Sequence, residues 1–556
     1  MSTPPLEEKQ HGIEVVDSHG YLQDHHSGDE EVGVVNKAAP LSRDLQNRHM
    51  QMIAIGGSIG AGLFVGSGKV LQSGGPASLI ICYMIVGVML LFTCQALAEM
   101  AVLYPVNGAF YTYVVRFVDP SWGFAMGWDY ALSWLTVLPF ELTAASITIR
   151  FWRDDINVGV WITVFLVVLS VIQIFGVRGY GEVEFILSII KILACIGFII
   201  LGIVINCGGT WKTATNPDYR HYLGAKYWHD PGAFNNGFNG FCGVFVVAAF
   251  AFGGTEMVGL AAAESANPRK SIPLATKQVF WRICFFYIVN LFILGLIVKS
   301  SDDRLLNSKG ANTKYSPFVI AIQDAGIKVL PSIFNAVITI AVISVANSCT
   351  FGSTRTMQAL AERGMAPKFL AYVDKHGRPL WCIVIQILFG FLAFIGEAGN
   401  SDDIFAWLLS LSGLGYFFVW GSICLAHIRF RSGWKAQGYS LDQIPYKPTL
   451  GVAGSWVGFL LNIICLMATF YNALYPSPDS KPDAKAFFQA YLAAPVVLFL
   501  YLLWKVISRD WRRLYVPLLQ MDLKSGLRML EQHEIDAAAQ QKSLKSLPMR
   551  IVHGLF

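Results

Sequence analysis

Gly56-Gly57-Ser58-Ile59-Gly60-Ala61-Gly62-Leu63-Phe64-Val65-Gly66-Ser67-Gly68 lies inside the first long apolar segment of the chain, and six of its thirteen residues are glycine. Because each glycine in a helix interior costs about 1 kcal/mol relative to alanine, an unbroken helix here is disfavoured by roughly 5–6 kcal/mol. Two interpretations are open. The pairs Gly56/Gly60 and Gly62/Gly66 have the GxxxG spacing of closely packed membrane helices. Alternatively, the helix is interrupted at this point.

A second glycine interruption, Phe250-Ala251-Phe252-Gly253-Gly254-Thr255-Glu256, lies in the sixth apolar segment. It favours the interrupted helix, because breaks at corresponding places in two halves of a chain indicate the binding site of a secondary transporter. Backbone N–H groups freed at the start of a half-helix attract an anionic group, and freed carbonyl groups attract an ammonium group. The two breaks together predict a site for a zwitterion, such as an amino acid.

The composition predicts a membrane protein. Of the 556 residues, 54% are hydrophobic and 14% are charged, whereas soluble proteins carry about 25% charged residues. Residues 1–49 hold 13 of the 79 charged side chains and residues 509–556 hold another 13, which leaves 53 for the 459 residues between them. So long a segment with so little charge excludes a soluble enzyme and a disordered scaffold. The net charge of +5, without any Lys/Arg block, does not indicate nucleic acid as a partner.

A helix that crosses a bilayer needs about 20 mainly apolar residues. On that scale the sequence predicts twelve spans, which we number in chain order: 50–72, 78–100, 124–148, 158–176, 184–206, 238–263, 280–299, 330–353, 381–398, 403–428, 454–475 and 487–508. The expected fold class is an all-α polytopic membrane protein with two inverted five-span repeats, about 50–206 and 238–428. Spans one and six are discontinuous, and two extra spans cover 454–508.

The tails and loops predict the orientation. The expected inner loops hold fifteen Lys and Arg residues and the outer loops thirteen, and the charges beside the first and last spans raise the ratio to twenty against thirteen. This excess favours a cytoplasmic location for both termini. We therefore expect residues 1–49 to be a disordered cytoplasmic tail and residues 509–556 to be a second cytoplasmic tail.

Ionisable residues inside spans are functional candidates, because a charge at mid-membrane costs about 2.5–3.5 kcal/mol on insertion scales. We expect Glu141 in span three to contact a substrate amine or to take part in proton coupling; a carboxylate bonded to a neighbouring helix is the alternative. Lys191 interrupts span five and either replaces a coupling cation and carries a proton, or extends to the inner interface. Glu256 is expected to bond backbone groups that Gly253 and Gly254 free.

Other polar residues in the spans are expected to face the same centre, namely Asn347 and Ser348 in span eight and Ser410 and Ser412 in span ten. Each of these is also compatible with simple contact between helices. No metal, cofactor or catalytic residue is expected, because the HExxH motif is absent and only His427 of the eleven histidines adjoins an apolar run.

Longer motifs follow one another in order from Leu41 to about Arg528. They include Leu41-Ser42-Arg43-Asp44-Leu45-Gln46-Asn47-Arg48-His49, Ile59-Gly60-Ala61-Gly62-Leu63-Phe64, Asn267-Pro268-Arg269-Lys270-Ser271-Ile272-Pro273, Gly377-Arg378-Pro379 and His427-Ile428-Arg429-Phe430-Arg431. In these motifs the chain resembles the fungal amino acid permeases, the yeast amino acid transporter family of the amino acid–polyamine–organocation superfamily. Among these it most resembles the general amino acid permeases.

The resemblance implies a proton-driven amino acid symporter of the plasma membrane that works by alternating access. By analogy, the substrate carboxylate meets N–H groups around Ser58–Gly62 and the amine meets carbonyl groups near Phe250–Gly253, while Glu141 and Lys191 match the family's glutamate and lysine. The expected substrate-binding residues are Ser58, Ile59, Gly60, Ala61, Gly62, Glu141, Phe250, Phe252, Gly253, Thr255, Asn347 and Ser348. Proton coupling is expected at Lys191 and Glu141, and Phe250 and Phe252 are expected to form the gate.

The chain departs from the family pattern at three positions. The family commonly has threonine where Ala61 stands, glutamine or another residue where Gly253 stands, and a small residue where Asn107 stands. The loss of a hydroxyl and an amide is expected to make the site roomier and less polar. A narrower permease for proline, basic or acidic amino acids is therefore an alternative.

The sequence lacks features that three other classes of protein would need. A polyamine or choline carrier would favour more core carboxylates than Glu141 and Glu256, a non-transporting nutrient receptor would need a longer tail, and a membrane hydrolase would need a nucleophile–base pair. The tails carry two features: Lys9 and Lys37 are candidate acceptors for a ubiquitin-dependent trafficking machinery, and Trp511–Leu530 has the apolar spacing of a helix on the inner membrane surface.

Overall fold

The computed structural model describes residues 45–57, 59–153, 155–265, 267–306, 316–397, 401–476 and 482–527. Its α-helices are α1 (Asn47–Gly56), α2 (Ser67–Leu103), α3 (Ala109–Phe117), α4 (Pro120–Ile149), α5 (Val158–Ile174), α6 (Gly176–Asn206), α7 (Gly237–Phe252), α8 (Met257–Leu260), α9 (Pro268–Trp281), α10 (Asn290–Ile297), α11 (Asp303–Leu306), α12 (Pro317–Asp324), α13 (Leu330–Glu362), α14 (Leu380–Gly390), α15 (Ser401–Ala436), α16 (Gly451–Leu474), α17 (Ala484–Tyr491) and α18 (Ala493–Ser508). Shorter or irregular helical turns are η1 (Gly62–Gly66), η2 (Pro217–Arg220), η3 (Trp228–Gly232), η4 (Ala261–Glu264), η5 (Arg282–Val289), η7 (Lys368–Ala371), η8 (Phe391–Glu397), η9 (Leu441–Gln443) and η10 (Leu518–Gln520). Among the described residues, the extended structure is a single isolated bridge between Leu45 and Ser265.

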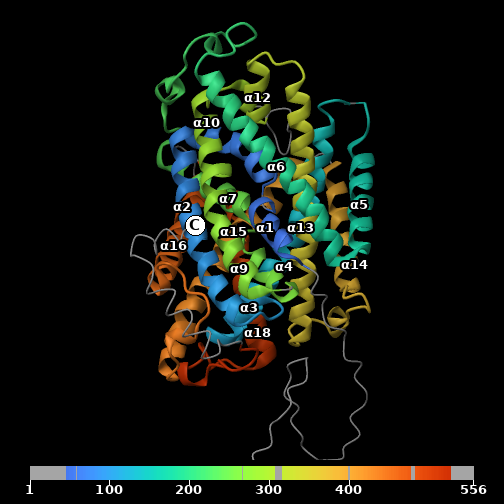
Figure 1. The fold of residues 1–556 in the computed structure, drawn as a ribbon, viewed down its shortest axis with the longest axis vertical. Coiled ribbons are helices and arrows are strands. Elements are labelled where there is room, and N and C mark those ends of the chain that lie inside the picture. The colour runs from blue at the N-terminus through green and yellow to red at the C-terminus, as the bar shows by residue number, and fades with distance from the viewer. Residues whose placement is uncertain are drawn as a thin grey trace, which may run out of the picture. The chain divides into compact units, whose positions relative to one another are not determined.

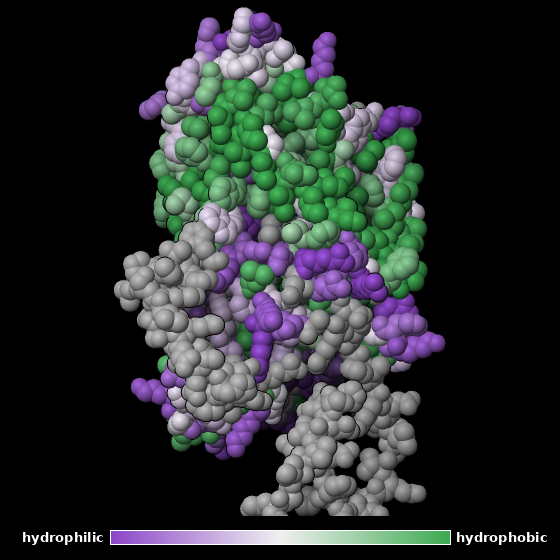
Figure 2. Space-filling view, in the orientation of Figure 1, coloured by the Kyte–Doolittle hydropathy of each residue, from purple (hydrophilic) through white to green (hydrophobic). Residues whose placement is uncertain are grey.

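The helices have the length and composition of membrane spans, which confirms the all-helical, multi-span fold class. Eight described helices are long and apolar enough to cross a bilayer, the bent pair α17–α18 makes a ninth, and two further apolar helices are shorter. Each of the twelve expected spans has a helical counterpart. The end of span one and all of span two lie in the stretch Gly62–Leu103, which bends at Gly75. On the face shown in Figure 2, hydrophobic side chains form a broad continuous field with hydrophilic residues above and below it.

Spans one and six are both interrupted, as the glycine-rich stretches predict. In span one, α1 ends at Gly56 and helical structure resumes at Ala61, before η1. In span six, α7 ends at Phe252 and α8 begins at Met257. Gly254 in this second break has a φ of +93°, which only glycine adopts readily. The breaks are therefore built into the local sequence.

The contacts between helices repeat in the two halves of the chain. In the first half α1 packs against α6, and in the second half α7 packs against α15. Similarly, α2 packs along α7 while α1 packs against α9, and α4 packs along α13, its counterpart. Two repeats of five spans produce such matched pairs. Figure 1 shows α1 among the helices of the bundle, with α5 and α14 together at one edge.

A sharp bend at Gly75 separates spans one and two. Gly75 has φ +81° and ψ 169°, in a region that is essentially restricted to glycine. The loop at 233–235 docks on this bend: the Ala77 N–H donates to the carbonyl of Ala233 (2.9 Å) and the Asn235 N–H donates to the carbonyl of Gly74 (3.0 Å). A Cβ atom added at Gly75 would lie 2.6 Å from the Ala233 oxygen.

Gly75→Ala is expected to lower the free energy of unfolding by about 2 kcal/mol or more, because a strained φ costs about 1–3 kcal/mol and the new methyl group displaces the docked loop. The thermal unfolding midpoint of the protein in detergent measures this loss. Gly364→Ala is the matched control, since Gly364 has φ +70° but a Cβ there would meet nothing within 4 Å. An equal loss in both variants would contradict the proposed steric contribution.

Three cations that were counted in the inner loops are buried. Arg355 donates to Glu264 (2.9 Å) and Arg431 donates to Glu99 (2.7 Å), while Arg282 donates to the hydroxyl of Thr255. Their positions therefore contribute nothing to the excess of positive charge in the loops, and the count of fifteen overstates it.

The tails differ from the expectation where the structure describes them. Helix α1 begins at Asn47, and Leu45 is already buried; the rest of the expected N-terminal tail, with Lys9 and Lys37, lies outside the described residues. Trp511–Leu530 was expected to form a helix on the membrane surface. This expectation was wrong for residues 511–527, which contain only the short turn η10 and pack on the bundle. For example, the Val516 N–H donates to the Val118 carbonyl (2.8 Å).

Candidate functional site

The break in span one lies directly against span six. A Cβ atom at Gly62 would be 2.5 Å from Cα of Ala251, and a Cβ atom at Gly60 would be 2.3 Å from Cγ2 of Val345 on α13. The glycines thus allow the backbones of spans one and six to touch. The helix resumes at Ala61, and the N–H groups of Leu63 and Phe64 both bond the carbonyl of Gly60 (3.2 Å each), so the N–H groups that open the helix are those of Ala61 and Gly62. Ile59, Gly60, Ala61 and Gly62 are in this segment; Ser58 lies outside the described residues.

The break in span six is held by a buried carboxylate. Glu256 accepts hydrogen bonds from the Gly254 N–H (3.2 Å), the Tyr130 hydroxyl (3.0 Å) and the Trp420 indole N–H (3.1 Å). These bonds tie the break to α4 and α15. The expectation that Glu256 bonds a backbone group freed by the glycines is therefore confirmed, and its role is structural.

The carbonyl groups at the end of α7 have side-chain partners. The Tyr287 hydroxyl donates to the Ala251 carbonyl (2.7 Å), and the Thr255 hydroxyl donates to the Phe252 carbonyl (2.6 Å). The Gly253 N–H still completes a helical turn by bonding to the Ala249 carbonyl (2.9 Å). Each carbonyl oxygen has two lone pairs, so the Tyr287 bond leaves a second acceptor position on Ala251, whereas the Phe252 oxygen also accepts from the Thr255 N–H (3.4 Å).

Glu141 lies in the middle of α4 and is buried. Its Oε2 atom has no hydrogen-bond partner among the described residues. Its charge interacts with that of Lys191 on α6. An ionised carboxylate is costly to bury without partners, so this position suits a group that binds a cation or a proton. The structure thus links the two ionisable residues that were expected to act in coupling.

Lys191 forms a buried cluster that includes a carboxylate not singled out from the sequence. Its ammonium group is 3.2 Å from Oε1 of Glu184, which lies two turns earlier on the same face of α6, and 2.8 Å from the hydroxyl of Ser344 on α13. The Ser344 hydroxyl donates to Oε2 of Glu184 (2.7 Å), and all three side chains are buried. Lys191 therefore does not extend to the interface. The seven-residue spacing of Glu184 and Lys191, two turns apart on one helix face, was the available signal.

The two phenylalanines expected to form a gate point in different directions. The Phe250 ring packs on Phe140 of α4, with centroids 4.9 Å apart. The Phe252 ring packs on Tyr287 (4.3 Å) and Tyr83 (5.6 Å) instead, towards η5 and α2. Of the two rings, only Phe250 thus faces α4, the helix that carries Glu141.

The remaining expected residues are engaged with other helices. Asn347 accepts a bond from Gln173 of α5 (3.2 Å), and Ser348 shares a bond with Tyr180 of α6 (3.3 Å). Thr255 is bonded to Arg282, as described above, on the side of η5. In span ten, Ser412 bonds the Thr136 hydroxyl of α4 (3.0 Å). The structure brings Asn347, Ser348 and Ser412 together with neighbouring helices rather than with the two breaks, whereas Thr255 lies in the break of span six itself.

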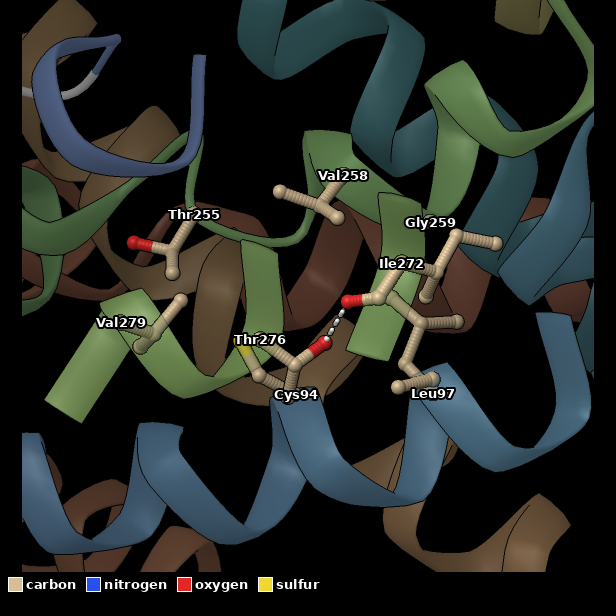
Figure 3. A pocket seen from close by; sticks show the side chains of 9 residues that line it. Cys94, Leu97, Thr255, Val258, Gly259, Ile272, Thr276 and Val279 are labelled. Atoms are coloured by element: carbon tan, nitrogen blue, oxygen red, sulfur yellow. Dashed lines mark hydrogen bonds between the residues drawn. The ribbon is translucent and has the colours of Figure 1, made fainter. Parts of the chain in front are cut away.

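A small pocket adjoins the break in span six on the side of α2 and α9 (Figure 3). It is lined mainly by apolar side chains, including Leu97, Val258 and Ile272, with the hydroxyl groups of Thr255 and Thr276. The Thr276 hydroxyl is directed to the Ile272 carbonyl (2.8 Å). Thr255 is the one expected binding residue that lines it. With no charged lining residue, this pocket offers nothing to recognise a carboxylate or an amine.

Gly253 does not leave empty space. A Cβ atom at Gly253 would lie 2.4 Å from Cζ and 2.7 Å from the hydroxyl oxygen of Tyr416 on α15. The Tyr416 ring stacks on Trp420 (5.4 Å) and fills the position that a longer side chain at 253 would need. The expectation of a roomier site at Gly253 therefore does not hold, because an aromatic ring from another helix occupies the space.

Asp129 on α4 is a second carboxylate not predicted from the sequence. It is buried, neither of its oxygens has a hydrogen-bond partner among the described residues, and it lies beside Gly415 of α15. In the expected span three (124–148) it lies close to the first residue of the span. The longer helix α4, which begins at Pro120, puts it inside the bundle.

Comparison with known proteins decides the family. Residues 49–515 match the sequence profile of the family described as Amino acid permease. The chain belongs to the amino acid permease family. It is 48% identical to the general amino-acid permease GAP2 of Candida albicans over 93% of this chain and 87% of the relative, and 47% identical to the general amino-acid permease GAP1 of Saccharomyces cerevisiae over 90% and 83%.

Another relative of this permease is named for a different class of substrate. It is 51% identical to the cationic amino acid transporter 1 of Schizosaccharomyces pombe, over 88% of this chain and 82% of the relative. In structure it resembles the manganese transporter of Eremococcus coleocola, with a TM-score of 0.50 and 13% sequence identity over 83% of this chain and 94% of the other. That likeness concerns the fold alone. The family membership identifies a multi-pass transporter of amino acids rather than an enzyme.

Proposed function

We propose that this permease imports L-amino acids by proton symport, with broad specificity, through alternating access. The observation that carries the proposal is the contact of the two helix breaks at Gly62 and Ala251. It brings the backbone N–H groups of Ala61 and Gly62, at the start of the resumed helix, close to the carbonyl groups at the end of α7. A zwitterion has the matching charges, since its carboxylate suits a helix N-terminus and its ammonium group suits carbonyl oxygens.

The side-chain pocket of the proposed site is formed by residues of the same two breaks and α4. Ile59, Gly60, Ala61 and Gly62 provide backbone on one side, and Phe250 and Gly253 lie on the other, with Glu141 nearby. Ser58, Phe252, Thr255, Asn347 and Ser348 stay in the proposed binding set, although the described ones bond neighbouring helices here. In the transport cycle, α1 and the end of α7 would move with substrate.

Proton coupling is proposed for Lys191 and Glu141. Both are buried in the bundle and interact electrostatically, and buried ionisable residues within spans are characteristic of proton pathways. The alternative is a narrower permease for proline, basic or acidic amino acids. The identity of 51% to a transporter named as cationic makes basic amino acids the first substrates to compare with neutral ones.

The location and domain boundaries are also proposals. We place the permease in the plasma membrane with both termini in the cytoplasm, on the basis of the charge excess and of general amino-acid permeases among its relatives. The transporter domain covers about 50–508, and the flanking tails are candidate sites for ubiquitin-dependent trafficking.

Uptake of labelled amino acids in a transport-deficient cell tests the proposed function. We expect uptake to rise as the external medium becomes more acidic and to collapse when a protonophore is added. Competition by a panel of unlabelled neutral, basic and acidic amino acids measures the substrate range. Uptake that depends on a sodium gradient and ignores the protonophore would contradict proton symport.

A further inference from the structure

Glu184 is at the centre of a buried polar cluster that joins three helices. Its Oε1 atom faces the ammonium group of Lys191 (3.2 Å) and accepts from the Ser188 hydroxyl (3.1 Å), while its Oε2 atom accepts from Ser344 of α13 (2.7 Å). The side chains of Glu184, Ser188, Lys191 and Ser344 are all fully buried. The cluster is thus closed to lipid. Through Glu184, the Lys191 ammonium group is linked to hydroxyl groups on both α6 and α13.

The cluster also reaches the interrupted span. The Ser188 hydroxyl is 3.3 Å from the carbonyl oxygen of Met52 on α1, in addition to its contact with Glu184. A serine hydroxyl has one hydrogen to donate. The Ser188 hydroxyl can therefore donate either to the Glu184 carboxylate or to the Met52 carbonyl of α1, but not to both at full strength. The protonation state of Glu184 decides between these partners, because an Oε1 atom that carries a proton becomes a donor itself.

We propose that Glu184 is a proton-coupling residue of this permease, which receives the proton of Lys191 and passes it on, and so controls the attachment of α1. In this step an Nζ–H bond of the Lys191 ammonium breaks and an Oε1–H bond forms on Glu184. The ion pair becomes a neutral amine and a neutral carboxylic acid, with no change in the number of protons. Glu184 then releases the proton to water on the inner side, and Lys191 takes up the next one from outside.

The proton transfer changes the bonds at α1. With Glu184 ionised, Ser188 donates to its carboxylate. With Oε1 protonated, the Ser188 hydrogen turns to the Met52 carbonyl and strengthens the link between α6 and α1. One proton thus alters a bond to the helix whose end forms part of the proposed substrate site. This inference rests on the proton symport proposed above and adds a residue and a route to it.

Other titratable groups surround the pair. On α6, Tyr180 interacts with Glu184 and Cys195 with Lys191; Glu141 of α4 interacts with Lys191. The ring of His49 on α1 packs against Gly181, one turn before Glu184. Among these groups, Glu184 is the carboxylate in direct contact with the Lys191 ammonium, which is why it is the acceptor in this proposal.

The test uses the full-length permease, purified and reconstituted into vesicles with a labelled amino acid that the wild-type protein transports. Glu184→Gln keeps the shape of the side chain but cannot hold a proton in exchange with Lys191. We expect exchange of labelled for unlabelled amino acid across the vesicle to persist, because exchange needs no net proton movement. Accumulation driven by an acid-outside gradient should fall by about tenfold or more and lose its dependence on pH.

Matched variants separate coupling from structure. Glu182→Gln is the control, since Glu182 is on the same helix but half exposed and paired with Arg48; it should accumulate substrate like the wild type. Glu184→Asp keeps a carboxylate and should recover part of the accumulation and its pH profile. If Glu184 only balanced the charge of Lys191 and held the helices together, Glu184→Gln would lower exchange as much as accumulation, and that result would overturn the proposal.

The outcomes also distinguish this inference from the proposed function. A wild-type protein that accumulates nothing in a proton gradient refutes proton symport, and the inference with it. Proton-driven accumulation by the wild type and equal accumulation, with the same pH profile, by Glu184→Gln refutes the role of Glu184 alone. If Glu184→Gln does not fold, Glu184→Asp decides: a pH profile identical to that of the wild type counts against the proposal, and a displaced one supports it.

Discussion

Glu141→Gln is expected to reduce amino acid uptake by about 100-fold or more while the protein still reaches the cell surface. Glutamine has the shape of glutamate, so the packing of α4 stays intact and the charge alone is lost. An ionisable residue inside a span is retained against a cost of about 2.5–3.5 kcal/mol on insertion scales, and each 1.4 kcal/mol is about tenfold in an equilibrium constant. Glu141 is buried and interacts with Lys191, so its loss disturbs both substrate binding and coupling.

The measurement is uptake of labelled substrate, normalised to the amount of protein at the surface. Thr143→Ala is a suitable control on the same helix, because Thr143 is half-buried and its hydroxyl bonds only the Pro139 carbonyl of its own helix (2.9 Å) among the described residues. That variant should transport nearly normally. If Glu141→Gln also transported normally, Glu141 would have no part in the mechanism.

Gly62→Ala is expected to have a similarly large effect through sterics. The new methyl group would lie 2.5 Å from Cα and 2.9 Å from Cβ of Ala251, so spans one and six must separate. Overpacking of this kind costs about 1–3 kcal/mol, and a misplacement of about 1 Å in a site can reduce its activity by about 100-fold. We expect uptake to fall by about 100-fold, because the N–H groups and the carbonyl groups no longer fit one zwitterion.

Gly197→Ala provides the comparison for Gly62→Ala. Gly197 lies in α6, and a Cβ atom there would meet nothing within 4 Å. The same chemical change is thus made in a membrane helix without a clash. Gly197→Ala should leave uptake unchanged. Equal uptake by Gly62→Ala and Gly197→Ala would show that the close contact of the two breaks is not required for transport.

The fold and the two breaks could be predicted because they depend on local sequence. Runs of about 20 apolar residues define spans in any context, and glycines such as Gly253 and Gly254 disfavour a continuous helix wherever they occur. The role of Glu256 also followed from its distance of two residues from the break. These features involve near neighbours in the chain.

The partners of buried charges could not be predicted in the same way. The cluster of Glu184 with Ser344 joins residues 160 apart in sequence, and Tyr416 is brought to Gly253 from span ten. Spans were also judged by apolar runs, which placed Glu184 and Arg282 at span ends, whereas α6 starts at Gly176 and buries Glu184 two turns inside. Long-range packing decides these positions.

The contact between Gly253 and Tyr416 makes side-chain volume at the two positions interdependent. Any larger residue at 253 requires a smaller one at 416, since a Cβ atom at 253 already falls within 2.4 Å of the ring. The two positions can therefore change in size only as a pair. If the residue of a relative is introduced at position 253 alone, its side chain will clash with the ring of Tyr416. Exchanging both residues together would keep the total side-chain volume constant while changing the polarity at the two positions.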